Sequence, residues 1–322
     1  MASFLHNSFD KGDKMTRRLF LFAGYDRDGI IDPTLVWYLR ALSDLGDIIL
    51  VMDCDVAATE LARVRKIPHV LHASATRHGE YDFGSYKRAY AYAADQDILK
   101  KYDWVYLVND SVYGPLGDLG PLLKDLESRG TDFVGMLECT NPDLPRHIQS
   151  WFVGLGRRVA TSDLFRDFIM SVRHQERKAL VVYRYEMRMT QMLVQNNYTY
   201  TTAYTDADAS AYVNPTRMAR AGMPFIKKAA INAANPAELL YPYMAPDMAE
   251  HVRAHAARNG IKLAPDDQVL SAPYVKRHRF TMFSIPLVTV WYKELRSGDI
   301  AYKICIFDKL PVFKLASKKQ KV

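Results

Sequence analysis

The chain has 322 residues, 49% of them hydrophobic, which is enough for one large domain or two modest ones around a sizeable core. Its longest apolar run, residues 280–292, is interrupted by polar residues and a proline and is too short to span a bilayer. Residues 1–14 lack the layout of a secretory signal, and the three cysteines form neither a metal-binding spacing nor an even set for disulfides. We therefore expect a soluble, reduced, cytoplasmic protein.

The formal net charge of +7 is concentrated at the C-terminal end. From Lys276 onward there are eleven Lys or Arg and three Asp or Glu, whereas the preceding 275 residues hold 32 basic and 33 acidic groups. A nucleic-acid enzyme carries its positive charge along a groove of the folded body. This distribution argues against a nucleic-acid partner.

In the first half, short apolar runs alternate with amphipathic stretches. Asp32 followed by Pro33 is typical of a helix cap and a first-turn proline. Strands alternating with helices of this length predict βαβ units and a mostly parallel α/β sheet. The predicted strands are 19–23, 47–52, 69–72, 104–108 and 133–137, and the predicted helices are 33–45, 57–66 and 82–101.

The second half is less regular. We expect residues 148–153 and 158–161 to form an antiparallel pair that turns at 154–156, because this turn contains two glycines. Helices are predicted from Ser162, over 185–195 and over 246–258, and a strand over 198–204.

The tail contains a short internal repeat, in which residues 280–290 are echoed by 304–315. Both copies are apolar, carry a central proline and lie among lysines. One interpretation is a β-hairpin packed on the domain; the other is a peripheral contact with an anionic membrane, which attracts apolar side chains combined with cations. We therefore divide the chain into a flexible N-terminus (1–16), a main domain (17–275) and a short basic appendage (276–322).

The most informative stretch is the apolar run 104–108, which leads directly into Asn109, Asp110 and Ser111 and then a Gly-Pro turn. In open α/β sheets, ligands bind outside the carboxyl ends of the strands. Asp110 is therefore the first candidate for a residue that contacts substrate.

A second candidate site is the start of the helix at 81–87. Asp82 is expected to cap it, Gly84 would let a ligand approach the backbone, and Lys87 lies one turn further on. Capped helices are common, so this pattern alone is weak evidence.

Other acidic residues offer further chemistry. Asp53 follows the second strand, where an acid either contacts a base or ribose or simply faces solvent; we do not assign a metal to it. Glu138 and Glu186 each have the chemistry of a general base for a sugar hydroxyl, although an acid at a helix start is also favourable with the helix dipole. His147, Gln149 and Ser150 follow a proline-rich loop that suits acceptor contacts, although an isolated histidine is more often structural.

Several motifs in one order resemble the rhamnan synthesis protein F family over about residues 17–240. They are residues 19–32, 81–87, 109–115, 147–152, 185–190, 214–216 and 224–227. The resemblance implies a GT-A-like glycosyltransferase, in which residues 17–138 form the nucleotide-sugar half and 139–275 the acceptor half.

The resemblance also implies roles for single residues. Asp110 takes the position of a ligand for a divalent metal, Mg²⁺ or Mn²⁺, although the motif departs from a full D-x-D because only one of its three residues is a carboxylate. Glu186 becomes the catalytic base, and His147, Gln149 and Ser150 contact the acceptor. The residues assigned to the nucleotide-sugar are Tyr25, Asp53, Asp82, Gly84, Lys87, Asn109, Ser111 and Lys227.

The implied reaction is inverting transfer of a sugar, most simply L-rhamnose from dTDP-rhamnose, onto a glycan or lipid-linked glycan of a cell-surface polysaccharide such as O-antigen or capsule. The enzyme would be cytoplasmic, with peripheral attachment to the inner face of the cell membrane through the tail. The alternative is a non-catalytic sugar-nucleotide or glycan-binding module with the same fold, for which the incomplete D-x-D is the best argument.

Overall fold

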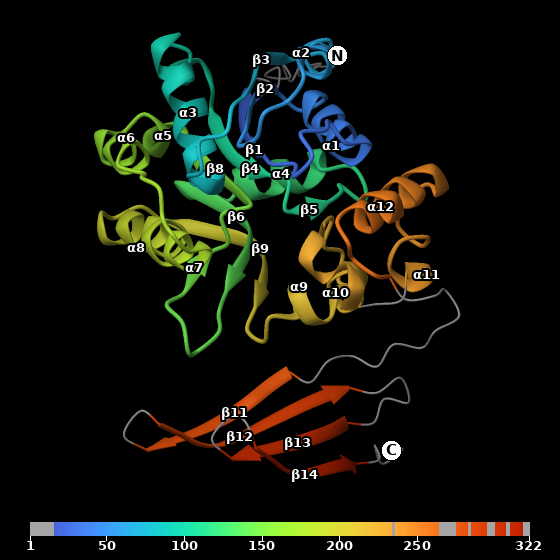
Figure 1. Cartoon of the computed structure of the whole chain (residues 1–322). Coiled ribbons are helices and arrows are strands. Elements are labelled where there is room, and N and C mark those ends of the chain that lie inside the picture. The colour runs from blue at the N-terminus through green and yellow to red at the C-terminus, as the bar shows by residue number, and fades with distance from the viewer. Residues whose placement is uncertain are drawn as a thin grey trace, which may run out of the picture.

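The computed structural model describes residues 16–233, 236–263, 275–282, 285–294, 300–306 and 310–317. At its centre is an eight-stranded sheet of order β3-β2-β1-β4-β8-β6-β7, in which β9 also pairs with β6 (Figure 1). The strands are β1 (Arg18–Gly24), β2 (Asp47–Met52), β3 (Val70–Ala75), β4 (Trp104–Asn109), β6 (Phe133–Cys139), β7 (His147–Ile148), β8 (Phe152–Gly156) and β9 (Tyr200–Asp206).

Most of this sheet is parallel. β1 pairs in parallel with β2 and β4, β2 with β3, and β6 with β9. β8 runs antiparallel to both β4 and β6, so these two strands share a direction, and the short β7 is also antiparallel. The mostly parallel α/β sheet expected from the sequence is confirmed.

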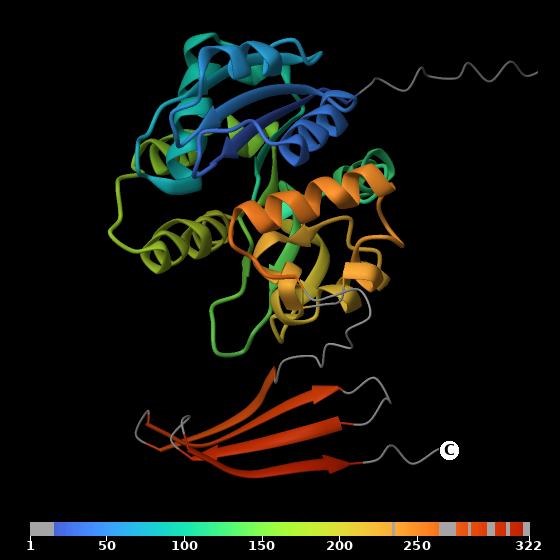
Figure 2. The same ribbon diagram turned by 45° about the vertical axis from the view of Figure 1, so that its right-hand side comes forward.

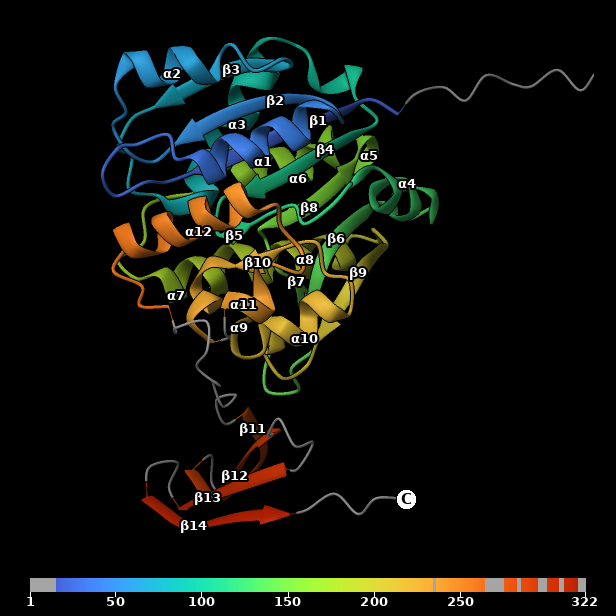
Figure 3. The same ribbon diagram turned by 90° about the vertical axis from the view of Figure 1, so that its right-hand side faces the viewer.

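Helices cover both faces of the sheet (Figure 3). One apolar cluster joins the sheet to α1 (Pro33–Ser43), α2 (Ala58–Val64) and α4 (Gly120–Ser128). The other joins it to α3 (Tyr81–Asp95), α5 (Arg157–Ala160), α6 (Asp163–Met170) and α8 (Arg188–Gln195). The helices of the first half therefore lie on opposite faces, as crossover connections between parallel strands require.

The sequence of β1 is a continuous apolar run, without alternation of apolar and polar residues, because both faces of the strand are buried. Leu19 and Leu21 face one cluster, while Phe20 and Phe22 face the other. A strand covered on both sides reads as a continuous apolar run. Full burial of each such side chain contributes about 1.5–3 kcal/mol, so this strand anchors both layers.

The antiparallel pair predicted for 148–153 and 158–161 is wrong. Gly154 and Gly156 lie inside β8, and the chain after Gly156 forms α5. A Cβ at Gly154 would lie 2.5 Å from the ring of Tyr106 on the neighbouring strand and 2.8 Å from Val134. This glycine makes room for strand neighbours and does not form a turn.

Two predicted helices differ from the observed ones. The helix expected over 82–101 ends at Asp95, because Asp97 adopts a left-handed φ of 48°, and a separate 3₁₀ turn, η1, covers Leu99–Lys101. The N-cap is Glu80, so Asp82 is the second residue of α3 and not its cap. The helix expected over 185–195 begins earlier, with α7 (Lys178–Val181) followed by a π-helical segment, η2 (Val182–Met187), and then α8.

The remaining elements pack around a third apolar cluster beside α1. They are the paired strands β5 (Val112–Tyr113) and β10 (Ile226–Lys227), α10 (Pro215–Arg220), η3 (Lys228–Ala233), α11 (Pro236–Leu239) and α12 (Pro246–Arg258). The short helix α9 (Ser210–Val213) contacts α10 and η3 but contributes Ala211 to the first cluster. The long helix α12 returns to contact α1 (Figure 2). This return brings the C-terminal end of α12 to the loop that follows β1.

The basic appendage forms its own four-stranded antiparallel sheet: β11 (Val275–Met282), β12 (Ile285–Glu294), β13 (Ile300–Ile306) and β14 (Leu310–Ser317). Each copy of the repeat belongs to one hairpin. The proline is the second residue of the second strand, and the pairing register shifts two residues before the end of the first strand. Thr281 pairs with Pro286 as Cys305 pairs with Pro311. The tail therefore contains two hairpins in one sheet instead of a single one, and packing of this sheet on the main domain stays an expectation.

Among the described residues, no helix is both long and apolar enough to cross a membrane.

Candidate active site

A cavity of about 540 Å³ opens at the carboxyl ends of β1, β2 and β4. This volume lies within the range of small-molecule and cofactor sites, and the position is where open α/β sheets bind ligands. Five of the predicted site residues line it: Tyr25, Asp53, Asp82, Asp110 and Ser111. Asp110 therefore lies in the lining of a cavity, as its position after β4 led us to expect, and its contact with a ligand stays a prediction.

Tyr25 and Arg77 form one wall. Tyr25 is half exposed, and the Arg77 guanidinium lies 5.4 Å from the centre of its ring. Asp53 is buried, and its Oδ1 accepts hydrogen bonds of 2.8 Å from the backbone N–H groups of His78 and Gly79. The Asp53 carboxylate therefore fixes the loop that carries Arg77, in addition to lining the cavity.

Asp110 lies at the turn between β4 and β5. Its Oδ2 accepts a 3.3 Å hydrogen bond from the Tyr25 backbone N–H and lies 3.6 Å from the Lys228 Nζ. Asn109 beside it is buried and does not line the cavity; its Oδ1 accepts from the Ser111 backbone N–H at 3.0 Å. Asn109 thus sets the shape of the turn that presents Asp110 and Ser111.

Asp82 faces the cavity from the first turn of α3. The residue before it, Tyr81, has a left-handed φ of 58°, an uncommon conformation that tends to occur at functional sites. Asn109 Nδ2 donates a 3.2 Å hydrogen bond to Asp82 Oδ2. Burial raises the pKa of Asp82 to about 6, with a further contribution from Asp110, while the nearby Lys178 opposes the shift. Asp82 is therefore a stronger base than an ordinary aspartate.

The Glu186 carboxylate lies in a different environment. It does not line the cavity; its Oε2 accepts from the Ser150 backbone N–H at 2.7 Å and from the Ser150 hydroxyl at 2.6 Å, and its Oε1 lies 3.7 Å from His147 Nε2. Burial alone would raise the pKa of Glu186, but the bonds from His147 and Ser150 bring it below its usual value. The predicted base is thus a weakened one that holds the 147–150 segment in place.

The three predicted acceptor residues belong to the same buried corner and do not line the cavity. His147 Nδ1 lies 2.7 Å from the Pro145 carbonyl oxygen. Gln149 Oε1 accepts from Trp151 Nε1 at 3.0 Å and from the Tyr212 hydroxyl at 3.3 Å. These hydrogen bonds engage the three side chains within the protein, and their role in acceptor binding stays a prediction.

Gly84 and Lys87 also lie outside the lining of the cavity. A Cβ at Gly84 would lie 2.2 Å from Glu80 Cβ and 2.8 Å from the ring of His78, so protein atoms fill the space expected for a ligand. Lys87 Nζ donates to Glu80 Oε1 at 3.1 Å and to the Val172 carbonyl at 2.9 Å. Both residues stabilise the start of α3 and do not reach the site.

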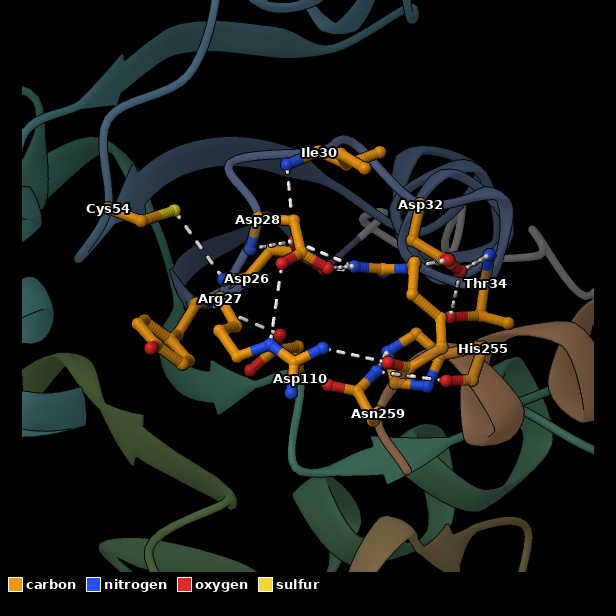
Figure 4. A network of polar contacts seen from close by, with 12 residues as sticks. Asp26, Arg27, Asp28, Ile30, Asp32, Thr34, Cys54, Asp110, His255 and Asn259 are labelled. Atoms are coloured by element: carbon orange, nitrogen blue, oxygen red, sulfur yellow. Dashed lines mark hydrogen bonds and ion pairs between the residues drawn. The ribbon is translucent and has the colours of Figure 1, made fainter. Parts of the chain in front are cut away.

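The structure adds a wall that sequence reasoning missed: the end of α12, where His255, Asn259 and Ile261 line the cavity. Arg258 holds this wall against the β1–α1 loop, donating to Asp26 Oδ1 at 2.9 Å and Oδ2 at 2.6 Å. It also donates to Asp28 and Asp32 from the same loop. Figure 4 shows these three acids converging on the end of α12.

The Arg258 contacts are charge-assisted and partly buried. Burial alone would raise the pKa of Asp26, but the hydrogen bonds from Arg258 and from two loop N–H groups lower it below its usual value. Asp26 therefore remains charged and bonded, and it closes the cavity on this side. The sequence signal was the repeated acid at positions 26, 28 and 32, but nothing local pointed to a partner more than 220 residues away.

Lys227 and Lys228 differ in position. Lys228 lines the cavity, whereas the predicted Lys227 is buried behind Ser111 and donates to Ser111 Oγ at 3.0 Å. Burial lowers the pKa of Lys227 to about 8, against the attraction of Glu186 and Asp82.

The donor set at Asp110 does not fit a resident divalent cation. Among the described residues, no group of three or more His, Cys, Asp or Glu is arranged to hold a metal ion. Asp110 is the carboxylate that the sequence offers for this role, and it already faces the Lys228 ammonium. A cation here would be repelled by that lysine, and its coordination would depend almost entirely on substrate oxygens.

The structure is that of an α/β protein with a cavity at the carboxyl ends of its parallel strands. The chain belongs to the rhamnan synthesis protein F family, whose model matches residues 48–259. No curated protein matches the chain. One similar solved structure is the glycosyltransferase GlyE of Streptococcus pneumoniae TIGR4, at 12% identity and a TM-score of 0.41; the match covers 79% of this chain and 66% of that one, slightly less than two thirds of its length.

Proposed function

We propose that the protein is a glycosyltransferase that binds a nucleotide-sugar in the cavity and transfers the sugar to a growing cell-surface polysaccharide. Membership of a rhamnan synthesis family makes L-rhamnose, carried as dTDP-rhamnose, the first donor to test. The observation that carries the proposal is the cavity itself. It combines an ionisable acid, Asp82, with the cations Lys178 and Lys228 at the carboxyl ends of parallel strands.

The reaction needs a base and stabilisation of the leaving group. The acceptor hydroxyl oxygen attacks the anomeric carbon as the bond to the diphosphate oxygen breaks, and the hydroxyl proton passes to a carboxylate. Asp82 takes this role in our proposal because it lines the cavity and its pKa is raised to about 6. Attack opposite the leaving group inverts the anomeric centre, so a β-linked donor gives an α-linked product.

The two ends of the cavity suit the two ends of a nucleotide-sugar. Tyr25 and Arg77 present an aromatic face and a planar cation, which favour stacking of a base. Lys228 and Ser111 line the cavity beside Asp110, where they offer a cation and a hydroxyl to an anion. In our proposal the diphosphate lies against Lys228 and Ser111.

The test uses the full chain and a panel of nucleotide-sugars with dTDP, UDP and GDP carriers. We expect dTDP-rhamnose to raise the melting temperature most, and release of dTDP to require a glycan acceptor. Binding without release in the presence of acceptor would favour the non-catalytic binding module. Absence of both a melting shift and product release across the panel would refute the proposal.

The basic appendage is proposed to dock on an anionic membrane, where lipid-linked acceptors reside. Its sequence supports this through eleven Lys or Arg among apolar residues. Removal of all residues after Tyr274 is expected to abolish co-sedimentation with vesicles that contain anionic phospholipid, while vesicles of neutral lipid serve as the control. Equal binding by the intact and shortened chains would rule out this role.

A further inference from the structure

The paired strands β5 and β10 place two consecutive lysines on either side of the Asp110–Ser111 turn. β5 begins directly after Ser111, and Lys227 of β10 pairs with Val112. The Lys228 backbone N–H then donates to the Ser111 carbonyl at 2.9 Å. β10 ends at Lys227 and η3 begins at Lys228, and the two side chains reach different parts of the turn: Lys227 Nζ contacts Ser111 Oγ, whereas Lys228 Nζ lies beside Asp110 in the cavity lining.

Lys228 is the cation on the cavity side. Its Nζ lies 3.6 Å from Asp110 Oδ2 and 5.6 Å from the centre of the Tyr113 ring, and its side chain is 19% exposed. The ion pair and the ring limit the positions that this long side chain can take. A cation held in this way loses less conformational entropy when it binds an anion than a free surface lysine does.

Lys227 is the cation behind the turn. Its ammonium lies between the rings of Trp151 at 5.1 Å and Tyr212 at 5.4 Å, and it donates to Ser111 Oγ. An ammonium group can only donate, so Ser111 Oγ is the acceptor and the Ser111 O–H remains available to donate elsewhere. Ser111 lines the cavity, so the charge of Lys227 acts on a ligand through this hydroxyl.

These contacts form an anion site at the place where the sequence predicted a cation. A divalent metal needs oxygen ligands, and two ammonium groups on the turn oppose its binding. A diphosphate needs cations and hydrogen-bond donors, and the turn offers Lys228, the Ser111 hydroxyl and, through it, Lys227. Developing charge on a leaving phosphate is stabilised by fixed groups of this kind.

We propose that Lys227 and Lys228, acting with Ser111, bind the diphosphate of the donor and stabilise its departure without a divalent cation. This inference rests on the proposed glycosyltransferase function. It assigns Lys228 to direct contact with the diphosphate and Lys227 to positioning and polarising Ser111. It assigns Asp110 to orientation of Lys228 and of the Tyr25 backbone N–H.

The first measurement is calorimetric titration of the full chain with dTDP and with UDP, in EDTA and again in excess Mg²⁺ or Mn²⁺. The inference predicts a dissociation constant that changes less than threefold between these conditions. Binding that appears only with metal, or tightens tenfold or more, overturns the inference and leaves the proposed function standing. Absence of binding under every condition overturns both.

Two substitutions then separate the roles of lysine and metal. Lys228→Met is expected to weaken dTDP binding at least tenfold, and added metal should not restore it. Asp110→Asn keeps an oxygen for the Tyr25 N–H but loses the ion pair that orients Lys228, so we expect a loss of dTDP affinity smaller than that of Lys228→Met, and the same loss in EDTA and in excess metal. A metal site predicts the reverse pattern, with the larger loss of affinity in Asp110→Asn and affinity retained in Lys228→Met.

Lys227→Met tests the buried cation, since Met fills a similar apolar volume. We expect a three- to tenfold loss of dTDP affinity, and an equal loss in Ser111→Ala. The double variant should bind no more weakly than either single variant, because Lys227 acts through Ser111. Additive losses would show that Lys227 acts independently and would overturn its assigned role.

Lys100→Met, at an exposed lysine outside the cavity, serves as the control with matched charge, and a melting curve for each variant verifies folding.

Discussion

The Asp82 region and the Glu186 region each contain a carboxylate among polar groups, but the pKa values of the two carboxylates shift in opposite directions. Asp82 has one amide donor, Asn109, and faces the cavity, and its pKa is raised to about 6. Glu186 accepts two hydrogen bonds from Ser150 and lies beside His147, and its pKa is lowered. The hydrogen-bond donors around each buried carboxylate therefore decide whether its pKa rises or falls.

The backbone around each acid reflects the same difference. Asp82 follows Tyr81, whose left-handed conformation starts α3 at the edge of the cavity. Glu186 belongs to the π-helical segment η2, whose extra residue per turn rotates its side chain toward β7 and Ser150. A regular helix would present a different face here, so the π-helical turn is what joins Glu186 to its donors.

The largest effect that we expect comes from Asp82→Asn. If Asp82 is the base, its amide replacement cannot accept the hydroxyl proton, and kcat falls by about two or more orders of magnitude, the usual contribution of general base catalysis. Affinity for dTDP should change less than threefold. Steady-state kinetics with calorimetry on the same preparation separates the two quantities. A kcat within threefold of the wild-type value would remove Asp82 from this role.

The second prediction tests the other region through Glu186→Gln. An amide in this position loses the charge that stabilises protonated His147, and with its oxygen kept toward the Ser150 donors it presents a donor to His147 in place of an acceptor. We expect a loss of about 2 kcal/mol in the free energy of unfolding, the size typical of hydrogen bonds to a charged group. Denaturant unfolding measures this loss.

Turnover by folded Glu186→Gln enzyme, measured well below its melting temperature, should stay within threefold of wild type. A hundredfold loss of kcat with unchanged stability would reverse the comparison and make Glu186 the base, as the sequence alone predicted. His147→Gln offers a matched control, since it removes the same ion pair from the other partner and should destabilise the corner without a large change in kcat.

The sequence predicted the first half well because its information is local. Each strand of a parallel sheet buried on both faces is a continuous apolar run, and the carboxyl end of such a run marks the ligand edge. Asp110 was therefore placed at the ligand edge from its neighbours alone, whereas Asp53 was left open between a ligand contact and a solvent-facing loop; the structure puts both in the lining of the cavity.

Residues brought in by distant parts of the chain were not predictable in this way. Lys228 reaches Asp110 through the pairing of two-residue strands, and Arg258 reaches Asp26 from the end of α12. Glu186 was assigned by motif position, but its role depends on Ser150, which is 36 residues away. Gly154 was interpreted as a turn because its true constraint, the Tyr106 ring, lies on another strand.

The third prediction concerns the dependence of kcat/KM on pH, which reports the ionisation of the free enzyme. Asp82 must be deprotonated to act, so kcat/KM should fall tenfold per unit, about 1.4 kcal/mol, as the pH drops below about 6. The charged groups that act on Asp82 are Lys178 and Lys227, which lower its pKa, and Asp110 and Glu186, which raise it. If kcat/KM instead begins to fall only near pH 4, the catalytic carboxylate has an unperturbed pKa and is not Asp82.

The smallest effect should come from Lys178→Met. This substitution removes a charge that acts on Asp82 and is not among the main influences on Glu186. Lys178 lowers the pKa of Asp82 more than any other group, so its removal should move the acid limb of kcat/KM upward by a fraction of a pH unit. The Lys178 side chain is exposed, so salt screens its effect, and the shift between variant and wild type should shrink at high ionic strength. Lys178 is not among the main influences on Glu186, so the unfolding free energy cost of Glu186→Gln should be the same in either background. If the pH at which kcat/KM falls moves downward in Lys178→Met, or if its upward shift persists in high salt, a carboxylate other than Asp82 controls the acid side of the profile.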